Sequence, residues 1–420
     1  MSSRLEGNAG QEWRQNGTLV LAASAGMAMS AVISFGLALF IAPLEQEFGW
    51  SRTEISSAHV TAAVLTILLA PAAGFMVDRF GPRRIGIASV IAMALALASL
   101  ALTGPNIWSW RLLYIFPAAA TVMIQPMVWT SAVTGTFFAG RGLALAVTLC
   151  GSSLCSIITP PLGYWLIEQF GWRMAFVGLG LIWGVAVLPL ILLFFTSAQD
   201  RARRAAPQAQ AQAHAGPSFF TTFIAEVANR RFLQLALAAF CIAVAVVSVS
   251  VTIVPILSAN GIERGEAAGI ASLLGFSAIA GRLSIGHLLD RFEGRYIAAL
   301  VVCMPIIGSL VLIYGQGSVP AASAAVLIFG LSMGAELDIL AYLTSRYFKP
   351  ASFGLMFGTI GGFVTSAGAI GPVVLNRVYD LTNSYVPALW AILPVCVLSA
   401  ALFLLMGPYP DRPEANRSAA

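Results

Sequence analysis

Three ionisable residues lie inside apolar stretches of the sequence, where a buried charge needs a partner. Arg282 precedes the next charged loop by eight residues, and so does Asp338. If these segments are helices that cross a membrane, both residues would lie ~12 Å from the charged loop at the helix end, at 1.5 Å per residue. An arginine at the centre of a membrane helix costs roughly 2.5–3.5 kcal/mol, so such charges usually mark a pathway or a binding site. Because the two charges lie at one depth, we expect them to pair if their helices face each other.

Glu336 is the second acid in the segment of Asp338. Two residues correspond to ~200° around a helix, so the two acids cannot both point the same way. The face of Asp338 also carries Tyr342 at i+4 and is the more polar one. We therefore favour Asp338 as the acid facing a central cavity and count Tyr342 among the candidate substrate contacts. For both acids, proton coupling and a structural role between helices remain open, and a structural ion pair is the alternative to substrate binding for Arg282.

Gln125 and Trp129 form a further candidate pair, at positions i and i+4 of another apolar stretch. They could provide a polar and stacking wall of a substrate cavity, although a lone tryptophan in a membrane helix is more often a packing residue. We find no spacing typical of a phosphate loop, a metal cluster or a nucleophile and its base. The sequence therefore predicts no enzyme, no cofactor and no metal site.

The composition indicates the kind of element that must position these residues. The chain has 420 residues, of which 58% are hydrophobic and 10% charged, whereas a soluble domain carries about 25% charged residues. This indicates an integral membrane protein, and the scattered basic residues do not indicate nucleic-acid binding. Twelve apolar segments of spanning length can be identified. They are residues 18–42, 54–77, 85–103, 111–136, 142–167, 173–195, 232–257, 265–289, 296–315, 321–346, 352–376 and 386–407.

The distribution of arginine and lysine predicts the orientation of these spans. With the N-terminus in the cytoplasm, 17 of these residues lie in tails and loops on that side and five on the other. Cytoplasmic loops carry the excess of positive charge, so we expect both termini in the cytoplasm. The first apolar run, of about 25 residues, is too long for a signal-peptide core, and we expect it to be retained.

The chain also contains an internal duplication. Gly74, Asp78 and Arg79 recur as Gly286, Asp290 and Arg291, each 212 residues later. Further landmarks repeat at the same spacing, namely Pro43 and Pro255, Gly49 and Gly261, Gly142 and Gly354, and Pro160 and Pro372. Each half starts on the same side of the membrane, which predicts parallel repeats. We expect an N-terminal six-helix half at residues 1–195, a disordered cytoplasmic linker at 196–231, and a C-terminal six-helix half with a cytoplasmic tail at 232–420.

The stretch from Gly74 to Arg84 resembles the signature of the major facilitator superfamily. It reads G-F-M-V-D-R-F-G-P-R-R and fits the pattern G-x-x-x-D-R-x-G-x-R-R at every defined position, and the copy at 286–295 is weaker. The resemblance implies an all-α fold of twelve transmembrane helices and a gating role for the motif. In that role Asp78 faces the positive N-terminus of a neighbouring helix, and the arginines pair across the seam between the halves. The residues concerned are Gly74, Asp78, Arg79, Gly81, Arg83, Arg84, Gly286, Asp290 and Arg291.

Other stretches are similar to the monocarboxylate porter branch of that superfamily and its bacterial relatives: Cys150 to Arg173, Gly371 to Tyr385 and Phe48 to Arg52. In that branch an arginine in the eighth helix holds the substrate carboxylate, and Arg282 occupies that place. The eukaryotic members carry an aspartate one turn earlier, where this chain has Ala278, and a lysine in the first helix, where residues 18–42 are uncharged.

The resemblance implies a monomeric secondary active transporter of the bacterial cell inner membrane, which moves a small organic anion, monocarboxylate-like, with protons by alternating access. Two alternatives stay open. One is a major facilitator carrier of a larger neutral or heteroaromatic solute, such as a vitamin or a drug. The other is a transporter-like sensor that binds its ligand without moving it.

Overall fold

The computed structural model describes residues 3–198, 200–201, 223–224 and 227–409, and these form helices joined by short turns. The N-terminal half contains α1 (Ser3–Phe48), α2 (Arg52–Phe80), α3 (Pro82–Ser99), the short 3₁₀ turn η1 (Leu100–Leu102), α4 (Ile107–Met123), α5 (Pro126–Thr134) and α6 (Arg141–Phe194). The C-terminal half contains α10 (Arg230–Ala259), α11 (Arg264–Ala271), α12 (Leu273–Arg291), α13 (Gly294–Tyr314), α14 (Val319–Tyr347), η2 (Pro350–Ser352), α15 (Phe353–Thr382) and α16 (Val386–Leu404). The predicted all-helical membrane fold is confirmed.

Eleven helical segments of the described chain are long and apolar enough to cross a membrane. The longest, α6, has 54 residues, and Gly171 inside it has a non-helical backbone with φ 76° and ψ 164°. Positive φ carries no steric penalty for glycine, so the chain bends there. The bend divides α6 into two of the twelve predicted spans, at the junction expected between residues 167 and 173.

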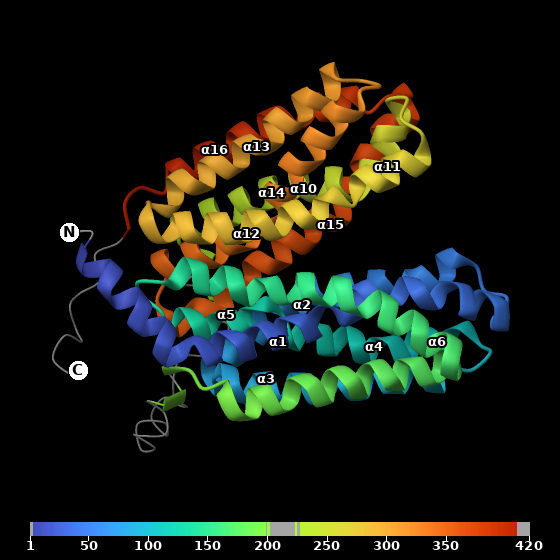
Figure 1. Cartoon of the computed structure of the whole chain (residues 1–420), viewed down its shortest axis with the longest axis horizontal. Coiled ribbons are helices and arrows are strands. Elements are labelled where there is room, and N and C mark those ends of the chain that lie inside the picture. The colour runs from blue at the N-terminus through green and yellow to red at the C-terminus, as the bar shows by residue number, and fades with distance from the viewer. Residues whose placement is uncertain (1–2, 199, 202–222, 225–226, 410–420) are drawn as a thin grey trace.

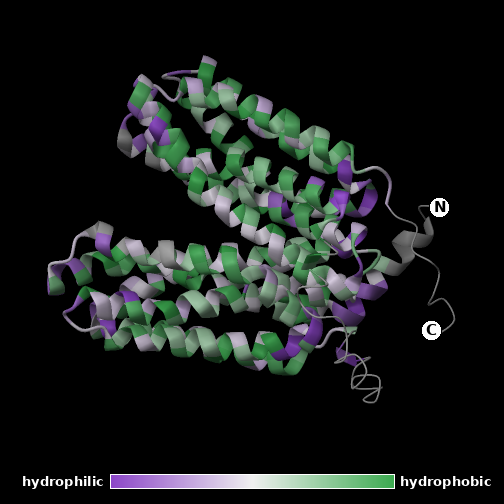
Figure 2. Ribbon diagram, turned by 180° about the vertical axis from the view of Figure 1, so that it is seen from behind, coloured by the Kyte–Doolittle hydropathy of each residue, from purple (hydrophilic) through white to green (hydrophobic). Residues whose placement is uncertain are grey.

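The two halves lie side by side and diverge away from the end at which α1 begins and α16 ends (Figure 1). We call the end at which the halves meet the latch end. There α2 contacts α15, and α6 contacts α12. Hydrophobic residues cover the helix shafts, while hydrophilic residues gather at the latch end and in the turns at the opposite end (Figure 2). This is the pattern expected of a protein whose shafts cross a bilayer.

Local capping chemistry explains where several helices begin. The Ser51 hydroxyl accepts a hydrogen bond from the Glu54 backbone N–H, and the Glu54 carboxylate accepts one from the Ser51 N–H, which closes a capping box at the start of α2. Pro82 and Pro126 occupy the first turns of α3 and α5, where their missing N–H costs nothing.

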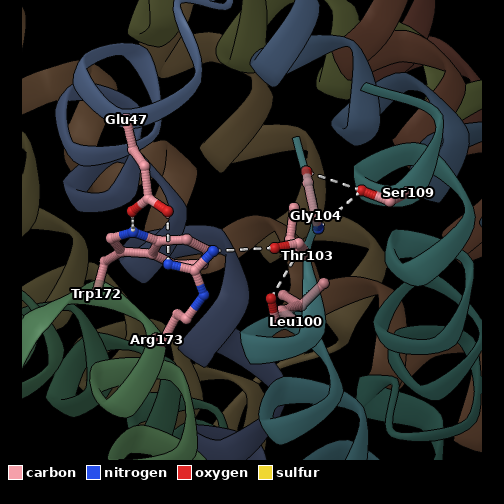
Figure 3. Close-up of polar contacts among 7 residues, drawn as sticks. All are labelled: Glu47, Leu100, Thr103, Gly104, Ser109, Trp172 and Arg173. Atoms are coloured by element: carbon pink, nitrogen blue, oxygen red, sulfur yellow. Dashed lines mark hydrogen bonds and ion pairs between the residues drawn. The ribbon is translucent and has the colours of Figure 1, made fainter. Parts of the chain in front are cut away.

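At the end opposite the latch, Glu47 and Arg173 together connect three segments of the N-terminal half (Figure 3). The Glu47 carboxylate at the end of α1 accepts hydrogen bonds from Trp172 Nε1 at 2.5 Å and from Arg173 Nη1 at 2.6 Å. Arg173 also donates to the carbonyl of Thr103 at 3.2 Å. These hydrogen bonds to Trp172 and Arg173 lower the pKa of Glu47.

The candidate membrane spans include Ile107–Thr134 and Gly265–Arg291, and the helices differ from the predicted segments in their details. The first helix begins at Ser3 and not near residue 18, so the polar N-terminal segment is helical as well. The expected span 111–136 is broken at Ile124 and Gln125, because Pro126 starts a new helix. The span 265–289 is likewise divided between α11 and α12 at Ser272. Most of the expected linker, at 199, 202–222 and 225–226, lies outside the described residues.

Candidate functional site

Asp78, near the end of α2, contacts the N-terminus of α15 in the other half. Its two carboxylate oxygens accept hydrogen bonds from the backbone N–H groups of Gly354 and Leu355, both at 2.8 Å. The first N–H groups of a helix have no partner within the helix and carry a partial positive charge. Asp78 supplies both the acceptors and the negative charge that this helix end requires.

The duplicated residue makes the reciprocal contact. Asp290, near the end of α12, accepts hydrogen bonds from the backbone N–H groups of Gly142 at 2.5 Å and Leu143 at 3.0 Å, at the start of α6. Gly142 is 212 residues before Gly354, as Asp78 is before Asp290. Each half therefore presents one carboxylate to the other and receives one in return. We call these two contacts the Asp78 latch and the Asp290 latch.

Glycines allow the helices to approach closely at both latches. A methyl group on Gly74 would lie 2.0 Å from the carbonyl oxygen of Gly354, and one on Gly142 would lie 2.2 Å from that of Gly286. Any side chain at these positions would push the halves apart. Gly81 follows α2 with φ 90°, where glycine avoids strain.

Of the motif arginines, Arg83 differs from the prediction. Arg83 donates hydrogen bonds to the carbonyl oxygens of Leu192 at 2.6 Å and Phe195 at 2.8 Å, within its own half. The expectation that it pairs across the seam is wrong, because it caps the free carbonyls at the end of α6 instead. Arg79, Arg84 and Arg291 are exposed.

Arg282 and Asp338 form a buried ion pair between α12 and α14. Arg282 Nη1 lies 3.2 Å from Asp338 Oδ1, and their side chains are 10% and 0% exposed. Both groups keep unused hydrogen-bonding capacity, because Arg282 Nε and Asp338 Oδ2 are buried without a partner among the described residues. A buried pair that satisfies only part of its polar atoms is poorly compensated for its loss of water.

Glu336, two residues before Asp338 on α14, is also buried, with 4% of its surface exposed. Its Oε1 atom has no hydrogen-bond partner in the described part of the chain. Two acids of α14 and one arginine of α12 are thus buried, and of the two acids only Asp338 forms an ion pair with the arginine.

A cavity of about 400 Å³ lies beside this ion pair, and Arg282 is part of its wall. Its lining comes from both halves, with Phe35 of α1 and serines of α6 on one side and residues of α10, α12 and α14 on the other. Serine hydroxyls and apolar side chains alternate around it, including Ser153, Ser156, Ser250, Phe276 and Met333. The Ser250 hydroxyl is buried without a partner among the described residues. The cavity therefore offers a cation, a free hydroxyl and apolar walls to one occupant.

The predicted wall of Gln125 and Trp129 is not part of this cavity. Trp129 is fully buried, donates through Nε1 to the carbonyl of Ile124 at 3.0 Å, and packs 5.2 Å from the Phe195 ring. A methyl group on Gly26 would lie 2.4 Å from its ring, so α1 is closely packed against it. Trp129 is a packing residue, and Gln125 occupies the turn before α5.

Tyr342 is also placed away from the cavity. Its ring lies near Gly294 of α13, where an added methyl group would be 3.2 Å from Cδ1. Because α13 begins at Gly294 and α12 ends at Arg291, this position is at the latch end. Tyr342 is not among the residues that line the cavity beside Arg282, since one turn of α14 carries it from the ion pair toward the latch end.

Sequence reasoning missed two kinds of residue. The cavity serines carry no distinctive sequence signal, since serine is common in membrane helices and only packing selects those that face inward. Arg141 is 3% exposed, donates to the Phe137 carbonyl at 2.8 Å, and reaches Ser345 of the other half at 3.2 Å. Arg141 directly precedes Gly142, one of the residues repeated at the spacing of 212, and this position could have identified it as a residue at the contact between the halves. In the described residues, His, Cys, Asp and Glu form no group of three suited to a metal ion.

Comparisons with known proteins agree with this architecture. A model of the Major Facilitator Superfamily matches residues 21–372. The chain is 28% identical over 277 residues to the MFS transporter asaE of Aspergillus flavus, covering 63% of this chain and 58% of that protein. It is 21% identical over 389 residues to monocarboxylate transporter 12 of Mus musculus, covering 84% of this chain and 77% of that protein.

A solved structure shares the fold. The crystal structure of the E. coli fucose:proton symporter FucP superimposes with a TM-score of 0.73 at 15% sequence identity, covering 93% of this chain and 98% of that one. The family model spans most of the chain and includes both latches, Arg282 and Asp338. The chain therefore belongs to the Major Facilitator Superfamily, and it is a membrane transporter and not an enzyme.

Proposed function

We propose that this protein is a proton-coupled secondary transporter of a small organic anion, most simply a monocarboxylate. The observation that carries the proposal is the buried pair of Arg282 and Asp338 at the wall of a cavity between the halves. Arg282 stays protonated at any accessible pH, so its charge must be balanced in every state of the transport cycle. Asp338 balances it in the empty cavity, and a substrate carboxylate balances it when substrate binds.

This exchange links substrate binding to proton binding. A carboxylate has the planar geometry that a guanidinium binds through two parallel hydrogen bonds, and the free Arg282 Nε is available for such a contact. When the substrate takes over Arg282, Asp338 loses its counter-charge in a site without solvent exposure. An unpaired carboxylate at that depth is costly, and taking up a proton removes the cost. Glu336 offers a second buried site for the proton.

The cavity supports an anion with an apolar body. Its volume suits a compact solute, and Phe35 and Phe276 would cover apolar carbons while serine hydroxyls donate to polar substituents. The mouse relative is named for monocarboxylate transport, which agrees with this substrate class. The aromatic side chains also favour a second candidate, a flat heteroaromatic solute without a carboxylate.

The latches provide the gate for alternating access. We place the latch end in the cytoplasm because of the distribution of arginine and lysine. With the N-terminus in the cytoplasm, 17 of these residues lie on the cytoplasmic side and five on the other. With both latches closed, the halves meet at the cytoplasmic end and diverge toward the outside, as in an outward-facing carrier (Figure 1). We further propose that the protein works as a monomer in the cell inner membrane.

Uptake of labelled monocarboxylates into proteoliposomes tests the proposal. The wild type should accumulate substrate when the outside is acidic, and an uncoupler should abolish the accumulation. Asp338→Asn should retain exchange of substrate and lose accumulation, because the side chain can no longer carry a proton. Asp380→Asn, a change of an exposed acid in α15, serves as the matched control and should behave as wild type. Uptake that ignores external pH and uncouplers would contradict proton coupling.

A further inference from the structure

The N-terminal part of α1 makes a contact that the function proposed above does not use. Glu12 lies in the polar segment before the apolar run, and its carboxylate reaches the turn that precedes α6. It accepts hydrogen bonds from the backbone N–H groups of Phe138 at 3.2 Å, Ala139 at 3.0 and 3.2 Å, and Gly140 at 3.1 Å. One carboxylate thus satisfies three consecutive donors of a turn.

The same helix N-terminus forms the Asp290 latch. The next free N–H groups, those of Gly142 and Leu143, donate to Asp290 from the other half. Five of the six residues 138–143 therefore donate a backbone N–H group to one of two carboxylates, three to Glu12 and two to Asp290. Glu12 belongs to the same half as α6 and moves with it, whereas Asp290 must leave when the latch opens.

Trp13 strengthens the contact of Glu12 with this turn. Its ring lies edge-on to Phe137 at 5.5 Å between centroids. A methyl group on Gly140 would lie 3.0 Å from Trp13 Nε1, so the turn is packed directly against α1. The conformation of residues 137–140 is thus set from outside by two adjacent side chains of α1.

The second half of the duplication fixes the equivalent turn differently. Residues 350–352 form the 3₁₀ turn η2, in which the Ser352 N–H donates to the Lys349 carbonyl at 3.1 Å. The position equivalent to Glu12, at an offset of 212, is Ile224, which has no acceptor in its side chain. The turn before α15 is held by its own backbone, and the turn before α6 is held by Glu12.

We propose that Glu12 is a positioning residue for the Asp290 latch. By holding residues 138–140, it keeps the first turn of α6 oriented so that the N–H groups of Gly142 and Leu143 point at Asp290. Two carboxylates near one helix end also repel each other, and by that effect alone the removal of Glu12 would close the Asp290 latch more tightly. We expect the positioning effect to outweigh this repulsion. Three N–H donors of its own stabilise the charge of Glu12, and the latch needs two N–H groups aligned at once.

Distance measurements between spin labels at the latch end test this proposal without any substrate. The labels are placed at Leu193→Cys in the N-terminal half and Phe292→Cys in the C-terminal half, both of which are exposed. The background replaces the five native cysteines, Cys150, Cys155, Cys241, Cys303 and Cys396. Glu12→Ala should raise the ratio of open to closed latch ends by about twofold to fivefold, the range expected for a charge at a helix end.

Two variants keep the test specific. Glu12→Gln retains one oxygen acceptor and should fall between Glu12→Ala and the wild type, which guards against general misfolding. Gln15→Ala changes an exposed residue of the same helical turn and should leave the ratio unchanged.

A double-mutant cycle then shows whether Glu12 acts through the latch. In an Asp290→Asn background, Glu12→Ala should have no further effect on the ratio, because the contact that it positions is already lost. A full additional effect in that background, no effect of Glu12→Ala alone, or a tighter latch end would each overturn the proposal. Since no transported solute enters the measurement, failure here is separable from failure of the organic-anion proposal.

Discussion

Replacing Asp78 by asparagine should open the latch end while leaving the shape of the side chain intact. Asp78 presents one oxygen to each of two N–H donors, both at 2.8 Å. Asparagine has one oxygen and one NH2 group, so one N–H of α15 would face another donor. At least one charge-assisted hydrogen bond is lost across the interface.

The size of the effect follows from that bond. A hydrogen bond to a charged group contributes roughly 1.5–3 kcal/mol. Each 1.4 kcal/mol is about a factor of ten in an equilibrium, so the ratio of open to closed latch ends should rise by about tenfold to about 150-fold. Asp290→Asn should act in the same direction, because its contact is the symmetry-related one.

Spin-label distances between Leu193→Cys and Phe292→Cys measure this ratio, and isothermal titration measures substrate affinity in parallel. We expect Asp78→Asn to populate the longer distance, to slow transport, and to leave the intrinsic affinity of the cavity nearly unchanged. Asp380→Asn is the control and should show the wild-type distances. A variant with wild-type distances, or one with normal flux and weakened binding, would refute the assignment of Asp78 to the gate.

Three further predictions test other parts of the structure. Gly74→Ala should cost about 1–3 kcal/mol of latch-closed stability, because its methyl group overlaps a backbone carbonyl, whereas Gly361→Ala, with open space around it, should be neutral in the same spin-label assay. Trp129→Ala should lower thermal stability by about 3–5 kcal/mol and leave substrate selectivity unchanged in uptake competition, since its ring is packed away from the cavity. Glu47, whose pKa is lowered from 4.5 by its hydrogen bonds to neighbouring side chains, should stabilise the protein above that pH. The advantage of wild type over Glu47→Gln in thermal melts should therefore shrink as the pH falls below 4.5.

The latches were predictable because a duplication leaves its own record in the sequence. The spacing of 212 residues relates Asp78 to Asp290 and Gly142 to Gly354. A carboxylate near the C-terminal end of its own helix is unfavourable there and is stabilised by the N-terminus of a neighbouring helix. The facing of Arg282 and Asp338 was predictable for a similar reason. Charges inside a membrane are rare and need partners, so equal depth is enough to suggest a pair.

Residues that act through packing were not predictable in this way. Trp129 and Tyr342 share helix faces with polar residues, yet which neighbour each face meets depends on helix rotation and crossing, which a single sequence does not specify. Trp129 fits against Gly26 of another helix, and Tyr342 fits against Gly294. Glu12 was missed because it precedes the apolar run, where charged residues normally face water and only the fold brings the turn before α6 to it.

Thermal protection of the purified protein by a carboxylate tests the central claim most directly. Arg282→Lys keeps the positive charge but loses the planar guanidinium, which can donate two parallel hydrogen bonds to a carboxylate. The substitution therefore separates the effect of hydrogen-bond geometry from the effect of charge. A small monocarboxylate should raise the melting temperature of the wild type and of the exposed control Arg377→Lys equally, and should protect Arg282→Lys clearly less. Equal protection of all three proteins by an uncharged heteroaromatic ligand, with no effect of any carboxylate tested, would contradict the organic-anion account.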